Sequence, residues 1–269
     1  GMASSQTEQD NRRYAVAAGV PMREPADSQE AYDFTAEAIR ISERWRLPVL
    51  LRLTTRICHS KTVVRRRPLG RPGEPPRFVR DIPGRVMIPA YARGAHRRLR
   101  AKLAELAAWN ETCELNRVCP GSGGGGGARL GIVTSGVCFA HAREAAPEAD
   151  VLKLAVTHPL PVEKVRGFAE SMDRCVVIEE GDPYLVESLR AAGIAVEGKP
   201  EPFRFGELSV SRVRRILARD ETPEPAPPPG KPPALCRGCP HRATFELLAE
   251  LGCIVAGDIG CYTLGVLPP

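Results

Sequence analysis

The sequence has no long hydrophobic run. No window of its 269 residues approaches the roughly 18 consecutive apolar residues that a membrane-spanning helix needs. Its first residues also lack the positive charge followed by an apolar stretch that marks an export signal. We therefore expect a cytoplasmic protein without a membrane segment.

The nine cysteines lack the pattern of a disulfide scaffold. They are odd in number and scattered, and one pair, Cys236 and Cys239, is closely spaced. Metal or cluster ligation is therefore the first hypothesis for that pair. Hydrophobic residues make up 43% of the chain, which is ordinary for a folded soluble protein and argues against disorder.

The sequence also lacks the usual features of a nucleic-acid-binding protein. Residues 61–100 hold 12 lysines and arginines against two acidic residues, a local net charge of +10 that leaves −4 for the remainder. This segment has only two aromatic residues among its cations, Phe78 and Tyr91, and no known module, so we expect no nucleic-acid partner. We interpret it as a solvated crossover strap over the acidic remainder.

Strands and helices alternate regularly in the second half of the chain. A run of five glycines at residues 123–127 precedes this half and lacks the Lys-Ser/Thr of a phosphate loop, so we interpret it as a linker. The alternation predicts an α/β fold with a parallel, doubly wound, Rossmann-like sheet. The expected strands are 130–134, 151–156, 174–179 and 194–196, and the expected helices are 140–146, 162–172 and 183–192.

The flanking regions have the patterns of incomplete domains. An N-cap at Asp27 and Ser28 predicts a helix that ends before Pro48, and a strand at 49–53 follows. Residues 61–93 predict a long crossing segment, a helix is expected at 95–109, and the last region has one helix and one strand at 254–256. We expect five segments, at residues 1–60, 61–127, 128–221, 222–234 (a Pro-rich linker) and 235–269.

Three separated motifs carry the candidate chemistry. The N-terminal motif is Ser-Ser-Gln-Thr-Glu-Gln-Asp-Asn-Arg at residues 4–12, with Thr-Thr-Arg at 54–56 followed by His59 and Ser60. The middle motif is Glu-Glu-Gly-Asp-Pro-Tyr at 179–184. The last motif joins Leu-Cys-Arg-Gly-Cys-Pro-His-Arg at 235–242 to Gly-Asp-Ile-Gly-Cys-Tyr-Thr-Leu-Gly at 257–265.

In this order the motifs resemble an internal part of a thiamine diphosphate-dependent 2-oxoacid:ferredoxin oxidoreductase, in particular the large (alpha) subunits of indolepyruvate:ferredoxin oxidoreductases. The resemblance implies the end of a pyrimidine-side domain at 1–60, a transketolase C-terminal-like domain at 128–221 and the start of a thiamine diphosphate-binding domain at 235–269. Incomplete thiamine-enzyme domains would thus flank the middle domain.

The resemblance also implies a function for the parent enzyme. That enzyme decarboxylates an aryl 2-oxoacid such as indolepyruvate to an acyl-CoA, with coenzyme A as substrate and ferredoxin as electron acceptor. It uses thiamine diphosphate with Mg²⁺ and [4Fe-4S] clusters, and it has a smaller beta subunit. The Mg²⁺ signature and the activating carboxylate would lie outside residues 1–269, so we expect no activity from this chain alone. The sequence leaves the particular 2-oxoacid open.

Three cysteines are candidate metal ligands. A Cys-x-x-Cys turn before a helix, here Cys236 and Cys239, converges with a cysteine at the end of the next strand, Cys261, in many α/β arrangements. With a distant fourth ligand such cysteines hold a [4Fe-4S] cluster in the related oxidoreductases. Zinc ligation and free or structural thiols remain alternatives at this stage.

The glycine-rich part of the last motif is a candidate cofactor site. Glycines after a strand allow close backbone approach to a diphosphate, although a simple tight turn has the same pattern. The resemblance extends this assignment to neighbouring side chains. The candidate cofactor-binding residues are His241, Gly257, Asp258, Gly260, Tyr262 and Thr263.

Two arginines are candidates for binding a substrate carboxylate. Arg12 and Arg56 could each pair bidentately with it, with surface salt bridges as the alternative. The middle motif at 179–184 is interpreted first as a strand end with a helix cap and second as an interdomain docking element. No catalytic residue is identified. A different class of function, a non-catalytic zinc-holding or basic docking module, also fits these patterns, and metal analysis would separate the two hypotheses.

Overall fold

The computed structural model describes residues 9–67, 77–122, 129–225, 234–257 and 260–267. Contacts divide the chain into two units, Gly1–Thr222 and Pro223–Pro269, and the division falls where the Pro-rich sequence begins. Within the described ranges, no helix is both long and apolar enough to span a membrane. The predicted domain boundaries stay predictions.

The first unit contains a four-stranded sheet. Its strands are β3 (Arg117–Cys119), β4 (Leu130–Ser135), β5 (Asp150–Leu154) and β7 (Arg174–Ile178). The order across the sheet is β3-β5-β4-β7. β4 pairs in parallel with both β5 and β7, whereas β3 pairs antiparallel with β5. The three parallel strands confirm the predicted α/β class, and β3 adds an antiparallel edge that the sequence pattern did not predict.

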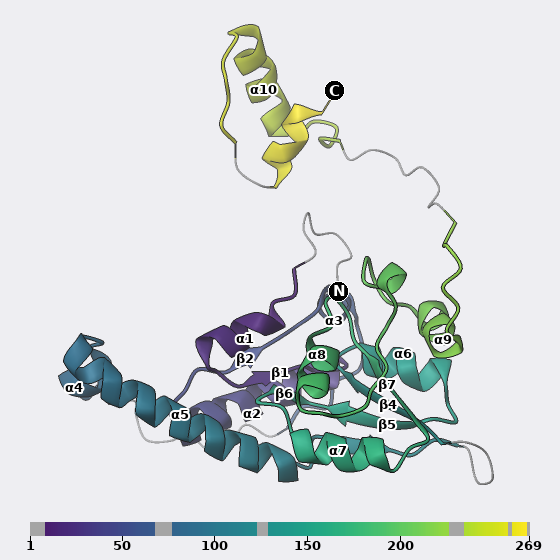
Figure 1. The fold of residues 1–269 in the computed structure, drawn as a ribbon. Helices are drawn as coiled ribbons and strands as arrows, with labels where there is room; N and C mark the ends of the chain where they lie inside the picture. The colour runs from purple at the N-terminus through teal and green to yellow at the C-terminus, as the bar shows by residue number, and fades with distance from the viewer. Residues whose placement is uncertain (1–8, 68–76, 123–128, 226–233, 258–259, 268–269) are drawn as a thin grey trace. The chain divides into compact units, whose positions relative to one another are not determined.

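Helices cover both faces of this sheet (Figure 1). The helices are α6 (Cys138–Ala145), α7 (Val162–Glu170), α8 (Tyr184–Ala191) and α9 (Val210–Ala218). Alternate strand residues point to opposite faces, so Val133 and Val177 pack with α7 and α8, whereas Ile132 and Val176 pack with α6 and α9. Burial on both faces explains why these strands are continuously apolar in sequence.

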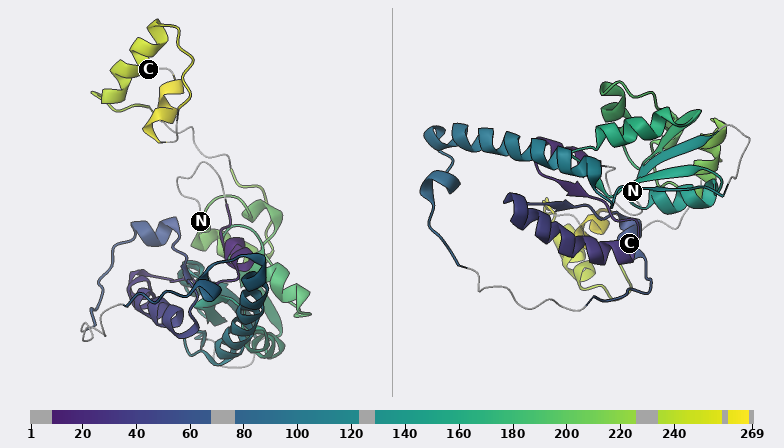
Figure 2. Two further views of the ribbon diagram at one scale, coloured as in Figure 1. Left: turned by 90° about the vertical axis from the view of Figure 1, so that its left-hand side faces the viewer. Right: turned by 90° about the horizontal axis from the view of Figure 1, so that it is seen from below.

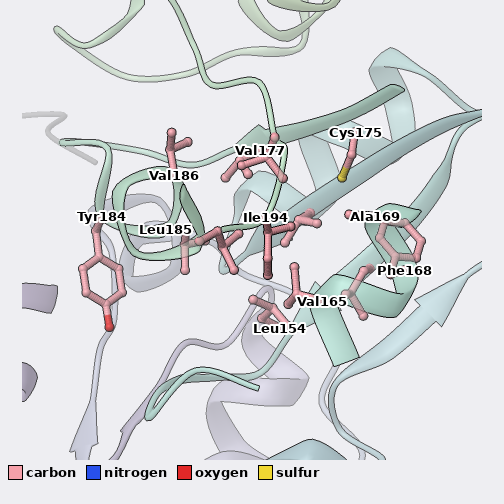
Figure 3. Packing of buried hydrophobic residues seen from close by; sticks show 14 of the residues in the cluster. Leu154, Val165, Phe168, Ala169, Cys175, Val177, Tyr184, Leu185, Val186 and Ile194 are labelled. Carbon is pink, nitrogen blue, oxygen red and sulfur yellow. The ribbon is translucent and has the colours of Figure 1, made fainter. Parts of the chain in front are cut away.

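The chain after α8 closes one of these two cores. Figure 3 shows Ile194 in the same cluster as Val165 of α7 and Leu154 of β5. The strand predicted at 194–196 is wrong as a strand, because the chain forms only a single parallel bridge there, between Val176 and Glu197. The apolar pattern at 194–196 reflects burial against β7. A buried segment can be apolar without forming the ladder of hydrogen bonds that defines a strand.

A second sheet joins the N-terminal segment to the first one. It has the order β2-β1-β6, with β1 (Met22–Arg23), β2 (Leu50–Leu51) and β6 (Val156–His158). β1 pairs in parallel with β2 and antiparallel with β6. The predicted strand at 151–156 is therefore two strands, β5 and β6, separated at Ala155, and the chain passes directly from one sheet into the other.

Three helices belong to the same N-terminal segment, namely α1 (Arg12–Ala18), α2 (Ser28–Trp45) and α3 (Thr55–His59). Only α2 was predicted. Its predicted N-cap is confirmed, because the Asp27 side chain accepts a hydrogen bond from the Glu30 backbone N–H at 2.7 Å. Its buried residues are Phe34, Ala38, Ile41 and Trp45, which share one helix face.

A buried pair of asparagines holds the junction between the two sheets. The Asn116 side-chain oxygen accepts hydrogen bonds from the backbone N–H groups of Ala155 (2.8 Å) and Val156 (3.1 Å). The Asn116 amide donates to the Asn110 side-chain oxygen at 2.7 Å, and Asn110 donates to the Pro159 carbonyl at 2.7 Å. These bonds satisfy backbone groups at the point where neither sheet can pair them.

The basic segment ends in a helical arm. It contains the short helix α4 (Ile82–Arg85) and the long helix α5 (Pro89–Thr112) (Figure 2). In these two helices only Leu106 and Asn110 are buried. α5 begins earlier than the predicted 95–109, with Pro89 in its first turn. Proline is tolerated there because backbone N–H groups in the first turn of a helix have no partner within the helix, so its lack of an N–H costs no hydrogen bond. Before α4, Arg67 pairs with Asp33 of α2 at 3.0 Å, as expected for a strap over acidic residues.

The second unit consists of α10 (Pro240–Glu250) and the 3₁₀ helix η2 (Cys261–Val266), and neither has a buried residue. The strand predicted at 254–256 is wrong, because these residues form no strand. Ile254 and Val255 are exposed, and no partner strand lies beside them among the described residues. An apolar run forms a strand only where a second strand satisfies its backbone groups.

Candidate functional site

The C-terminal ends of β4 and β7 lie side by side, and the helices that follow them cover opposite faces of the sheet. In open α/β sheets, ligands bind in the crevice at such a point. Gly136 follows β4 and Gly181 follows β7, with positive φ angles of 55° and 68°. This edge of the sheet is therefore the first place where a site is expected.

The N-terminal segment of the chain occupies this position. The Arg12 side chain is 1% exposed, and its Nη1 donates to the Glu179 carboxylate at 2.6 Å. Its Nη2 donates to the backbone carbonyls of Glu180 (2.7 Å) and Asp182 (2.8 Å), and Nε donates to Asp10 at 2.9 Å. All three nitrogens of the guanidinium group thus bind groups of the protein.

Glu179 connects this cluster to the following helix. Its carboxylate accepts hydrogen bonds from the backbone N–H groups of Leu185 (2.8 Å) and Val186 (3.1 Å) in the first turn of α8. The first interpretation of the middle motif is confirmed, since Glu179 accepts from the first turn of α8. Glu179 also binds Arg12 of the N-terminal segment, and interdomain docking stays a prediction. A glycine is favoured at position 181, because its φ is 68° and a Cβ there would lie 3.0 Å from the Asp10 carboxylate.

A second buried ion pair lies next to the first. The Glu24 carboxylate accepts from Arg52 Nη1 at 2.6 Å and from the Thr157 hydroxyl at 2.8 Å. Arg52 Nε donates to the side-chain oxygen of Asn11 at 2.7 Å. The Tyr184 hydroxyl donates to the Thr157 carbonyl at 3.0 Å. The two groups meet at Tyr184, because the Arg12 guanidinium lies 5.2 Å from the centroid of the Tyr184 ring. Their residues include positions at the ends of β1 and β2, in β6 and at the start of α8.

Burial and charge act in opposite directions on the carboxylates around Arg12. Burial disfavours the Asp10 carboxylate, but the hydrogen bond and charge of Arg12 outweigh it and lower the pKa of Asp10. Burial raises the pKa of Glu179, despite Arg12 and two backbone N–H groups. Burial also opposes the charge on Arg12, yet Glu179 and Asp10 raise its pKa well above the ordinary value. Arg12 is therefore a permanently charged, fully engaged anchor.

The two predicted substrate arginines are thus not brought together. Arg12 is buried in the network, and a substrate carboxylate could reach it only if it left Glu179 and Asp10. Arg56 lies at the surface in α3, where its side chain is 57% exposed and forms an ion pair with Glu207. The substrate-binding role of both arginines stays a prediction.

In the second unit, the Cys-x-x-Cys turn leads directly into a helix. The Cys239 N–H donates to the Cys236 carbonyl at 3.0 Å, and Gly238 between them has a φ of 75°. Cys239 is the N-cap residue of α10, and its Sγ lies 3.4 Å from His241 Nδ1. The predicted turn before a helix is present, and it places a thiol beside an imidazole.

Aromatic contacts join α10 to η2. The rings of His241 and Tyr262 meet edge-on with centroids 4.8 Å apart, and the Phe245 and Tyr262 rings lie 6.5 Å apart. Gly265 of η2 lies so close to Phe245 that a Cβ would come within 2.7 Å of its ring. A glycine is therefore needed at this position for the two elements to meet.

Three of the predicted cofactor-binding residues line one hollow in this unit. Gly257, Tyr262 and Thr263 border a space of about 450 Å³, together with Phe245 and other mostly apolar residues. Gly260 closes the turn beside it, because its carbonyl accepts the Thr263 N–H at 3.1 Å. Asp258 lies outside the described residues.

The predicted cysteine ligands are not gathered around one point. Cys236 and Cys261 are exposed, and Cys239 is partly buried beside His241. In the part of the chain that the structure describes, no three His, Cys, Asp or Glu side chains form a group that could hold a metal ion. This donor set does not fit a cluster as placed, so the three-cysteine site stays a prediction.

Comparison with solved structures agrees with the architecture. The chain aligns with a 2-oxoglutarate:ferredoxin oxidoreductase from Magnetococcus marinus with a TM-score of 0.55 and 15% sequence identity. The alignment covers 79% of this chain and 45% of that chain. No family model matches the sequence. The fold is therefore that of part of a 2-oxoacid:ferredoxin oxidoreductase.

Curated relatives extend the similarity to the sequence. The chain is 39% identical to indolepyruvate oxidoreductase subunit IorA of Methanothermobacter thermautotrophicus and 35% identical to that of Archaeoglobus fulgidus. In both comparisons the match covers all of this chain and 47% of the relative. The predicted resemblance to these large subunits is confirmed, and the chain spans about half the length of the curated relatives that it matches.

Proposed function

We propose that this chain is part of a 2-oxoacid:ferredoxin oxidoreductase that acts on an aryl pyruvate such as indolepyruvate. The reaction would be oxidative decarboxylation to an acyl-CoA, with coenzyme A as acyl acceptor and ferredoxin as electron acceptor. The observation that carries the proposal is the match to IorA subunits over the whole chain. A smaller partner subunit belongs to the proposal.

Thiamine diphosphate with Mg²⁺ is the proposed cofactor. The residues that would hold it in this chain are Gly257, Tyr262 and Thr263, because they border one hollow and the glycine leaves its backbone accessible. His241 would support this site by fixing the Tyr262 ring. When bound, thiamine diphosphate supplies the electron sink for decarboxylation of a 2-oxoacid. We assign no electron-transfer step to Cys236, Cys239 or Cys261.

The contribution of the first unit is positional. Arg12 ends the N-terminal motif at residues 4–12, and its bonds to Glu179 and the neighbouring carbonyls fix that end of the motif at the edge of the sheet. A fixed anchor of this kind orients nearby groups without touching the reacting atoms. We therefore propose Arg12 as a positioning residue.

The function is tested with the longest reading frame that contains this chain, co-expressed with the small subunit. Viologen reduction is measured with indolepyruvate, coenzyme A and thiamine diphosphate. We expect reduction that requires all three, with indolepyruvate preferred over 2-oxoglutarate. Absence of indolepyruvate-dependent reduction in a folded complex would contradict the proposal.

A pair of variants tests the hollow in the second unit. Thr263→Val removes a hydroxyl from the hollow, and we expect it to raise the KM for thiamine diphosphate about tenfold, which corresponds to roughly 1.4 kcal/mol. Thr244→Val is the matched control, because Thr244 is exposed on α10 and does not line the hollow. Equal effects of the two variants would argue against the assignment.

A further inference from the structure

The helical arm and the end of α2 enclose a hollow that the proposed function does not use. Its volume is about 630 Å³, within the range of about 300–1,000 Å³ that is typical of small-molecule sites. Three elements contribute to it: the C-terminal end of α2, α4 and α5. We call it the basic hollow. Its lining residues are Arg46, Asp81, Pro83, Gly84, Arg85, Arg98 and Lys102.

Positive charge exceeds negative charge in the lining of the basic hollow, which has three arginines and one lysine against Asp81. Among the residues that the structure describes, the guanidinium groups of Arg46, Arg85 and Arg98 form no ion pair. The single carboxylate of the lining, Asp81, is engaged as a helix cap, since it accepts the Gly84 N–H at 3.0 Å. The lining therefore keeps a formal excess of three positive charges, and an anion bound between the cations would reduce their repulsion.

Two of the cationic side chains, those of Lys102 and Arg85, make local contacts, and the three arginines are exposed. Lys102 Nζ donates to the Arg46 carbonyl at 3.4 Å, which joins α5 to the end of α2. The Arg85 guanidinium lies over the Phe78 ring, 5.4 Å from its centroid. Contacts of this kind lower the entropy that a bound ligand would otherwise cost.

We propose that the basic hollow binds a small ligand that carries two or more phosphate groups. Arginine matches phosphate oxygens bidentately, and three arginines with a lysine suit a multiply charged anion better than a single carboxylate. A concave site of this volume, formed by three elements, favours a small molecule over an extended acidic polymer.

The experiment uses the whole chain and inorganic pyrophosphate as the probe, with binding measured by calorimetry at low ionic strength. Arg85→Ala/Arg98→Ala removes two lining cations. Arg97→Ala/Arg100→Ala is the matched control, because it removes the same charge from exposed positions on α5 that do not line the basic hollow. We expect the first pair to weaken pyrophosphate binding at least about tenfold and the second pair about twofold or less.

Two further measurements test whether arginine geometry matters beyond charge and whether a nucleotide is the ligand. Arg85→Lys/Arg98→Lys keeps the charge and should still weaken binding, since lysine cannot form bidentate bonds to phosphate. ADP should bind at least as tightly as pyrophosphate if a nucleotide is the natural source of the phosphates. Equal losses in both alanine pairs, no pyrophosphate binding to the unaltered chain, or tighter binding of a polyglutamate peptide would each overturn the proposal.

Discussion

One buried guanidinium group determines how the N-terminal segment meets the α/β domain. Arg12 lies between Asp10 and Glu179, both with side chains 1% exposed. Removing such charges from water is costly, and the cost is recovered only when every partner is satisfied. Here the surrounding backbone carbonyls and the start of α8 supply the missing partners.

We predict that Arg12→Met destabilises the protein by about 3–5 kcal/mol, because Asp10 and Glu179 would remain buried without a counter-charge. Chemical denaturation followed by circular dichroism measures the change in the free energy of unfolding. Arg13→Met is the control next to it in sequence, since Arg13 pairs with Glu187 at the surface, where a loss of about 1 kcal/mol or less is expected. Similar losses in both variants would show that the buried network is not the main stabilising contact.

Contacts between individual residues could not be predicted where the two residues lie far apart in the sequence. Arg12 was recognised as a candidate, but its partner Glu179 lies 167 positions away, and no local pattern connects them. Glu24, Arg52 and Thr157 were missed for the same reason. By contrast, Gly257, Tyr262 and Thr263 lie within seven positions and line one hollow, because a short segment has few ways to separate them.

At the scale of elements, capping chemistry defines where α2 begins. The Asp27 side chain accepts the Glu30 N–H, and Glu30 in turn accepts the Ala26 N–H at 2.9 Å, which is a reciprocal capping arrangement. This helix carries the buried face of Phe34, Ala38 and Ile41, so its first turn is coupled to the core.

We predict that Asp27→Ala lowers the free energy of unfolding by about 1 kcal/mol, as is usual when a helix loses its N-cap. Asp81→Ala is the matched control, because Asp81 caps α4 in the same way but α4 has no buried residue. Thermal unfolding should show a lower midpoint for the first variant and almost no change for the second. An equal shift would mean that the cap of α2 is not coupled to the core.

Elements with strong periodic patterns were predicted well, and short or edge elements were not. The strands β4 and β7 and the helices α7 and α8 were expected within a few residues of their observed bounds, because each has a continuous or periodic apolar pattern. β1, β2 and β3 are two or three residues long, so their pairing depends on neighbours from other parts of the chain.

At the scale of the whole molecule, the Pro-rich sequence at 222–233 and the glycine run at 123–127 differ in how they relate to the division of the chain into two units. The two units divide after Thr222, where the Pro-rich sequence begins, whereas the glycine run at 123–127 falls inside the first unit. β3, before the glycine run, pairs with β5 after it, and Asn116 binds the backbone of Ala155. Covalent continuity at the glycine run is therefore not what holds the first unit together.

We predict that limited proteolysis cuts near both sequences with different outcomes. Cleavage near residues 222–233 should release the C-terminal unit as a separate species in gel filtration. Cleavage near residues 123–127 should leave two fragments that elute together until denaturant is added. Separation of those two fragments under native conditions would instead support a domain at 128–221 that folds independently of the rest.

The sequence by itself determined the α/β class, the main strands and helices of the middle domain, and the family that the chain resembles. These properties depend on local periodicity and on motifs whose residues are close together along the chain. Only the tertiary structure decided that Arg12 pairs with Glu179, that β5 and β6 belong to different sheets and that four cations surround one hollow. Each of these features depends on contacts between distant segments, and burial, which gives such contacts their energy, exists only once the chain has folded.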